Sequence, residues 1–116
     1  MAAPKLVTLK CAPCKAGTPP LADDRVHELL AQVSDWNLVD HAIQRTVRCE
    51  NFKQACALFM EVALLCEEEG HHADIRVFGW RNIEFTLSTH KIGGLSENDF
   101  IVAAKINQLL RASIHN

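Results

Sequence analysis

The chain has 116 residues, of which 48% are hydrophobic and 22% are charged, a balance typical of one compact soluble domain. Its formal net charge is -2, and scattered Lys and Arg residues give no basic surface for nucleic acid or an anionic membrane. No apolar run approaches the roughly 20 residues that span a bilayer, and the first ten residues lack the apolar core of a signal peptide. We therefore expect a cytosolic protein with neither nucleic acid nor membrane as a partner.

The first twenty residues contain all four prolines and show no periodicity, which predicts an irregular arm over residues 1–20 and a folded domain over 21–116. The five cysteines are odd in number, and two of them lie at helical spacing within an apolar stripe, so we expect reduced thiols. Cys11 and Cys14 form a CxxC. Neither a second pair nor a following helix accompanies it to complete a zinc or redox motif.

A helix and a pair of strands are predicted before residue 50. Apolar residues on one helical face, with acidic residues early in the segment, predict a helix over about 22–33. The segment from Trp36 to Cys49 carries loosely alternating β-formers. It predicts two short antiparallel strands that are joined near Asp40 and His41.

A second helix is predicted over about 52–69, because Asn51 suits an N-cap and Gly70 suits the left-handed position after a helix. One apolar stripe of this helix contains Phe52, Ala55, Cys56, Phe59, Val62, Ala63 and Cys66. Four further apolar residues lie outside that stripe, namely Leu58, Met60, Leu64 and Leu65. This apolar arc is wider than one packing surface requires, so we expect a second surface to cover it.

A β-hairpin and a third helix follow. The hairpin is expected to turn near Gly79 to Asn82, and the alternation after the turn puts His90 on the polar face with Ser88. Ser96 with Asp99 forms a capping-box pattern that starts the last helix. The order α-β-β-α-β-β-α predicts an α+β fold, a four-stranded antiparallel sheet with three helices packed on one face.

The stretch EEEGHHADI places two neighbouring histidines beside carboxylates. Imidazole titrates near neutral pH and can both give and accept a proton, so His71 and His72 are candidates for acid/base chemistry. Glu67, four residues before His71, is positioned to orient an imidazole. The alternative is a polar helix end, with Glu67 simply solvated.

Metal binding is the competing chemical interpretation, with His71, His72, His90, Glu67 and Asp99 as possible ligands. The spacing argues against a metal site: the chain contains no HExxH, and adjacent histidines in extended chain point in opposite directions. Three other histidines have no such neighbours and are expected to be surface or structural residues: His27, His41 and His115.

EEEGHHADI and the later TLSTHKIGGLSENDFIVAAKI resemble the pterin-4a-carbinolamine dehydratases. The resemblance runs over roughly residues 19–112 and includes PPL before the first helix and Trp36 before the first strand. Two departures occur: Ala73 replaces the usual proline, and the segment around Phe78, Gly79 and Trp80 is one residue longer than in the animal enzymes.

The resemblance implies dehydration of 4a-hydroxytetrahydrobiopterin to quinonoid dihydrobiopterin, in tetrahydrobiopterin recycling, without a metal or organic cofactor. It implies that His71 and His90 transfer protons, and that Glu67 and Asp99 orient imidazoles. Substrate-binding residues on this interpretation are His72, Ser88, Thr89 and Trp80.

The resemblance leaves a second function open, because relatives in this family also act as transcriptional coactivators or assembly factors without clear catalysis. Retention of Glu67, His71, His72, His90 and Asp99 favours the enzyme. The wide apolar arc of helix 51–69, together with the family's dimers and tetramers, predicts a homodimer or homotetramer assembled through that helix.

Overall fold

The computed structural model describes residues 5–113 of the chain. Its three α-helices are α1 (Asp23–Leu30), α2 (Phe52–Glu69) and α3 (Glu97–Ser113). Its four strands are β1 (Asn37–Val39), β2 (Ala42–Arg48), β3 (Asp74–Phe78) and β4 (Asn82–Leu87). Three short 3-10 turns, η1 (Leu6–Thr8), η2 (Ala31–Val33) and η3 (His90–Ile92), complete the order of elements.

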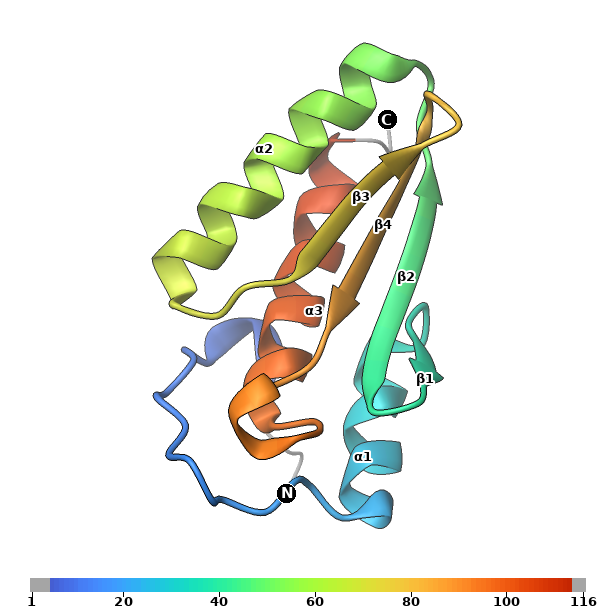
Figure 1. Ribbon diagram of the computed structural model, residues 1–116. Coiled ribbons are helices and arrows are strands. Elements are labelled where there is room, and N and C mark those ends of the chain that lie inside the picture. Colours follow the sequence, from blue (N-terminus) through green and yellow to red (C-terminus); the bar gives the residue numbers. More distant parts are fainter. Residues whose placement is uncertain (1–4, 114–116) are drawn as a thin grey trace.

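The strands form one antiparallel sheet in the order β1-β2-β4-β3. Figure 1 shows α2 and α3 side by side along the sheet, with α1 near the end of β2 that adjoins β1. The predicted α+β class is confirmed, as is the order of the helices and strands. The first helix ends earlier than predicted, at Leu30, and η2 continues the winding to Val33.

The core lies between the sheet and the helices. Along β4 the buried residues Ile83, Phe85 and Leu87 alternate with less buried polar residues, as expected for a sheet with one face covered. Trp36 and Phe100 are almost fully buried against this layer. The sheet's other face is polar, and on it Glu84 of β4 pairs with Arg76 of β3.

Helix α2 begins and ends as the sequence predicts. The Asn51 side chain accepts a hydrogen bond from the Gln54 N–H, and Gly70 adopts a left-handed conformation with φ of 68°. The orientation of the helix differs from the predicted one. Its buried face contains Ala55, Leu58, Val62, Cys66 and Glu69, whereas Phe52, Phe59, Met60 and Leu64 are exposed.

This rotation has a physical cause in the composition of α2. Because the helix is apolar over most of its circumference, several overlapping arcs fit a period of 3.6 residues equally well. The shape of the sheet and of α3 then decides which arc is buried. Leu58, predicted to lie outside the packing stripe, is 1% exposed, whereas Phe52 is 56% exposed.

The described part of the N-terminal arm lies against the domain. Leu6 in η1 is buried, and η1 contacts α3. Beyond this turn, residues 9–22 contain no helix or strand, in line with the absence of periodicity. Among residues 5–113, no helix combines the length and the apolar character that crossing a bilayer requires.

Candidate acid/base site

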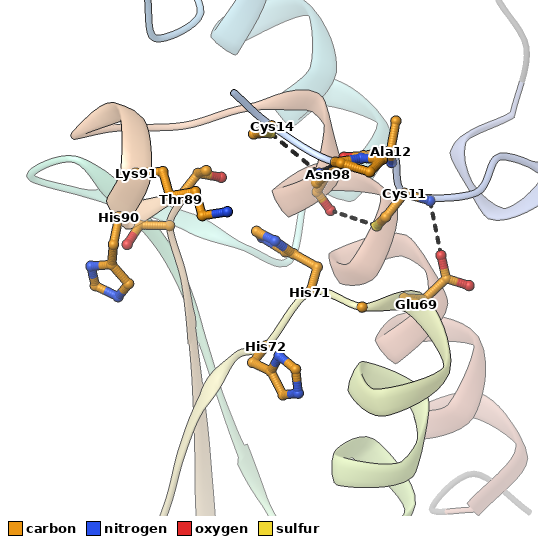
Figure 2. A pocket seen from close by; sticks show the side chains of 13 residues that line it. Cys11, Ala12, Cys14, Glu69, His71, His72, Thr89, His90, Lys91 and Asn98 are labelled. Atoms are coloured by element: carbon orange, nitrogen blue, oxygen red, sulfur yellow. Dashed lines mark hydrogen bonds between the residues drawn. The ribbon is translucent and has the colours of Figure 1, made fainter. Parts of the chain in front are cut away.

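A cavity of about 430 Å³ opens where the end of α2, the end of β4 and the start of α3 meet. Figure 2 shows His71 projecting into it, with His90 on one side and residues of the N-terminal arm on the other. The cavity is lined by Cys11, Ala12, Pro13, Cys14, Glu69, Gly70, His71, His72, Ser88, Thr89, His90, Lys91 and Asn98. Its volume falls within the usual range for small-molecule sites.

The turn after α2 fixes the start of the histidine pair. The N–H groups of Gly70 and His71 both donate to the carbonyl of Cys66, at 2.9 and 3.2 Å. The left-handed conformation of Gly70 costs little without a Cβ, and it reverses the chain toward β3. The Ala73 N–H then bonds to Cys66 Sγ at 3.4 Å. Ala73, which replaces the proline usual in the resembled family, thus contributes a hydrogen bond to this turn.

His71 is oriented by a buried carboxylate. Its Nε2 lies 2.6 Å from Oδ1 of Asp99, and the Asp99 side chain is fully buried. The other carboxylate oxygen accepts hydrogen bonds from Thr89 Oγ1 at 2.8 Å and from the Ser96 N–H at 2.9 Å. Since an ionised carboxylate only accepts, it selects the tautomer of His71 with hydrogen on Nε2 and leaves Nδ1 free to exchange a proton.

Asp99 therefore has two roles at the start of α3. Its bond to the Ser96 N–H is one half of the predicted capping box. The other half, a bond from the Asp99 N–H to the Ser96 hydroxyl, is missing, because that hydroxyl instead lies 2.7 Å from Thr89 Oγ1. With Thr89 donating to Asp99, Ser96 must donate to Thr89, which forms a buried chain of three polar side chains that ends at His71.

The predicted pairing of Glu67 with His71 is wrong. The Glu67 carboxylate contacts Nε2 of His72 instead, and both side chains are largely exposed. Helical spacing would place Glu67 beside residue 71, but the helix ends at Glu69 and Gly70 turns the chain away. Glu67 lines a neighbouring groove on α2 rather than the main cavity.

The other residues expected at the site come from the chain after β4. Ser88, Thr89 and His90 all line the cavity. Thr89 is buried in the network with Asp99, whereas His90 is exposed at the start of η3. Figure 2 shows His90 on the opposite wall from the N-terminal arm.

Trp80, expected to bind substrate, does not line this cavity. It lies in the turn between β3 and β4, at the other end of β4 from Ser88 (Figure 1). The six residues of β4 at about 3.3 Å each put roughly 20 Å between the two ends of the strand. Within one copy of the chain, the indole therefore lies too far away to contact a molecule in the cavity.

Sequence reasoning missed several lining residues. The sequence indicates no chemical role for Glu69 and Asn98, and it predicts that the arm around Cys11 and Cys14 is irregular. The CxxC singled out these two thiols, yet nothing local indicated that they would meet residues about 58 to 87 positions away. All five cysteines are free thiols, as predicted.

Among residues 5–113, no three His, Cys, Asp or Glu side chains are grouped so that they could hold a metal ion. His27 is exposed and its Nδ1 lies 2.7 Å from the carbonyl of Asp23. His41 is exposed in the turn between β1 and β2, and His115 lies outside the described residues.

The fold and the site define a small α+β protein with a histidine and carboxylate site in a cavity at one end of its sheet. Residues 19–109 match the family model described as pterin 4 alpha carbinolamine dehydratase. The chain belongs to this family. A Methylococcus capsulatus protein, named provisionally as a pterin-4-alpha-carbinolamine dehydratase, is 46% identical over 111 residues, which are 94% of this chain and 96% of that protein.

Two solved structures share the fold. A transcriptional coactivator/pterin dehydratase from Brucella melitensis aligns with a TM-score of 0.72 and 28% identity, covering 78% of this chain and 97% of that one. A pterin dehydratase-like protein, described as a RuBisCO assembly factor in the alpha-carboxysome, aligns with a TM-score of 0.51 over 64% of this chain and 84% of that one. At 24% identity, the second likeness shows the fold alone.

Proposed function

We propose that this chain dehydrates 4a-hydroxytetrahydrobiopterin to quinonoid dihydrobiopterin, a step that returns the oxidised pterin to tetrahydrobiopterin recycling. The observation that carries the proposal is the pair of cavity histidines, with His71 held through Nε2 by the buried Asp99 and His90 on another wall. Membership of the pterin dehydratase family supplies the substrate class.

The reaction breaks the bond between C4a and its hydroxyl and removes the proton from N5. One imidazole donates a proton to the departing hydroxyl, which leaves as water, and another accepts the N5 proton. The electron pair of the N5–H bond forms the new double bond between N5 and C4a, so atoms and charges balance without a metal or organic cofactor. His71 and His90 take these proton-transfer roles, while His72, Ser88 and Thr89 bind the pterin.

The test is a stopped assay with synthetic 4a-hydroxytetrahydrobiopterin. His71→Ala and His90→Ala should each lower kcat, since a positioned proton-transfer group contributes roughly 10²–10⁴-fold. His72→Ala should mainly raise KM. The hydroxyl can occupy either face of C4a, so each single variant is expected to keep activity on one stereoisomer, whereas the double variant should lose activity on both.

His41→Ala is the matched control, because His41 is an exposed histidine in the turn between β1 and β2. Turnover near wild type in the correctly folded double variant would place the chemistry elsewhere. The alternative is a non-catalytic protein-binding module, a transcriptional coactivator or assembly factor. That alternative would use the exposed apolar residues of α2, which are also the surface on which we expect a second copy of the chain to pack.

A further inference from the structure

One wall of the cavity is built from the N-terminal arm. Cys11, Ala12, Pro13 and Cys14 line it, and Figure 2 shows this segment across the cavity from His90. These residues precede the part of the chain, 19–109, that matches the family model. The segment has no helix or strand of its own, so its position depends on bonds to the rest of the fold.

Two of these bonds involve the carboxamide of Asn98. Its Nδ2 donates to the carbonyl of Ala12 at 2.6 Å, and its Oδ1 accepts from the N–H of Ala12 at 3.0 Å. A carboxamide both donates and accepts, so it can satisfy both backbone groups of a single residue, which neither a carboxylate nor an ammonium group can do. Asn98 is buried, which protects these bonds from competing water.

A second anchor lies at the end of α2. Glu69 accepts the N–H of Cys11 on Oε1 at 3.0 Å, and Lys105 donates to its Oε2 at 2.6 Å. Burial alone would raise the pKa of the Glu69 carboxyl, but the bonds from Lys105 and Cys11 outweigh it and lower that pKa. The charged form that holds the arm is therefore favoured.

The first turn of α3 links the arm to the acid/base site. Asn98 and Asp99 are consecutive residues on that turn, and their side chains point in different directions. Asp99 bonds to His71, and Asn98 bonds to Ala12. The first turn of α3 thus fixes both the His71 imidazole and the cavity wall that the N-terminal arm forms.

From these contacts we propose that Asn98 is a positioning residue, and that it docks residues 11–14 as a fixed wall of the pterin-binding cavity. This inference rests on the proposed function for the identity of the ligand. The docking itself rests on the hydrogen bonds of Asn98 and Glu69 alone, so it can be tested without turnover.

Cys11 provides a readout of docking. Its thiol donates to the carbonyl of Asn98 at 3.7 Å. Burial and the nearby Glu69 charge raise the pKa of Cys11 to about 12. Because the thiolate is the reactive form, N-ethylmaleimide should label Cys11 in the native protein at least about tenfold more slowly than in the urea-unfolded chain.

Asn98→Ala should release the arm and speed native-state labelling of Cys11 at least about tenfold, as measured by peptide mass spectrometry. Asn98→Asp keeps an acceptor for the Ala12 N–H but loses the donor, so it should give an intermediate rate. Glu97→Gln, an exposed neighbour on the same turn, should match wild type. Labelling of Cys11 within twofold of wild type in Asn98→Ala, with an unchanged melting temperature, would overturn the docking role.

The role in binding is tested by kinetics and by protection. Asn98→Ala should raise KM for 4a-hydroxytetrahydrobiopterin about tenfold while kcat changes much less. In the wild type, 7,8-dihydrobiopterin should slow the labelling of Cys14, which lines the cavity. Two results would contradict the claim that residues 11–14 form a wall of the binding cavity. One is an unchanged KM in Asn98→Ala when its Cys11 is exposed, and the other is no protection of Cys14 by 7,8-dihydrobiopterin in an active wild type. Lack of turnover by the wild type would refute the proposed function, whereas the Cys11 rates would still decide the docking.

Discussion

At the scale of single residues, the neighbouring histidines His71 and His72 lie in different environments. His71 is held by a fully buried carboxylate with two further hydrogen bonds. His72 contacts a carboxylate that is 73% exposed, where solvent screening makes such pairs weak. The buried pairing fixes a tautomer and a ring orientation, which is why we propose the proton-transfer role for His71 and the binding role for His72.

Asp99→Asn tests this tautomer assignment. Two donors, Thr89 Oγ1 and the Ser96 N–H, face the same carboxylate oxygen, so the amide oxygen must stay there and the amide NH₂ must face His71. Nε2 would then accept instead of donate, and the hydrogen would move to Nδ1. We expect kcat to fall roughly 10²-fold or more, with little change in KM.

Nitrogen NMR of the His71 ring shows directly, without substrate, which ring nitrogen carries the hydrogen. The wild type should show hydrogen on Nε2, and Asp99→Asn should show it on Nδ1. If both proteins carried the hydrogen on the same nitrogen, the orienting role of Asp99 would be incorrect. A variant that combines Asp99→Asn with His71→Ala should lose little more activity than His71→Ala alone, because Asp99 acts through His71 and the two residues form a unit.

At the scale of elements, the ends of helices rather than their middles build the site. The C-terminal turn of α2 carries Glu69 and leads into His71, and the first turn of α3 carries Asn98 and Asp99. The 3-10 turn η3 starts with His90. Because each end is fixed by a cap or a tight turn, the side chains at that end and just beyond it are held in position.

The N-cap of α2 is the clearest prediction at this scale. Asn51 Oδ1 accepts the Gln54 N–H at 2.8 Å, and Gln54 Oε1 accepts the Glu50 N–H at 2.7 Å. Asn51→Ala should lower the free energy of unfolding by about 1 kcal/mol, measured by urea titration. Asn51→Asp, which keeps the acceptor, should lose much less; equal losses in both variants would show that the cap bond contributes little.

At the scale of the whole molecule, α2 exposes an apolar surface that a single copy leaves uncovered. Phe52, Met60 and Leu64 are 56%, 58% and 62% exposed, and Phe59 is 37% exposed. Phe52 and Phe59 are seven residues apart and Met60 and Leu64 are four apart, so the four side chains share one broad side of the helix. Phe59 also lines the groove that His72 lines. We expect a second copy of the chain to pack on this surface, since an isologous contact buries the same patch twice.

Sedimentation tests this assembly. The wild type at micromolar concentration should sediment as a dimer or tetramer, and Met60→Glu combined with Leu64→Glu should shift it to the 12.9 kDa monomer, because burying unpaired carboxylates is costly. The helical circular dichroism of the variant should remain. A monomeric wild type would refute assembly through α2.

Metal removal tests the cofactor-free mechanism. An acid/base dehydration by histidines should survive prolonged dialysis against a chelator, with kcat unchanged. Elemental analysis of the purified protein should find no stoichiometric ion. Loss of activity that zinc restores would instead assign the histidines to a metal.

The sequence determined the features that depend on near neighbours. Alternation along residues 83–87 predicted β4 and its buried face, and Asn51 and Gly70 predicted both ends of α2. The histidine motif and the resemblance it carries predicted the family and the residue types of the site. These features persist because hydrogen bonds and periodicity within a few residues specify them.

Only the tertiary structure decided which residues meet. His71 pairs with Asp99, 28 positions away, rather than with Glu67, because the helix ends between Glu67 and His71. The arm reaches Asn98 across 86 positions. Which arc of α2 is buried depends on the shapes of the sheet and α3, and the length of β4 separates Trp80 from the cavity. No local pattern encodes such contacts, since they arise from how whole elements pack.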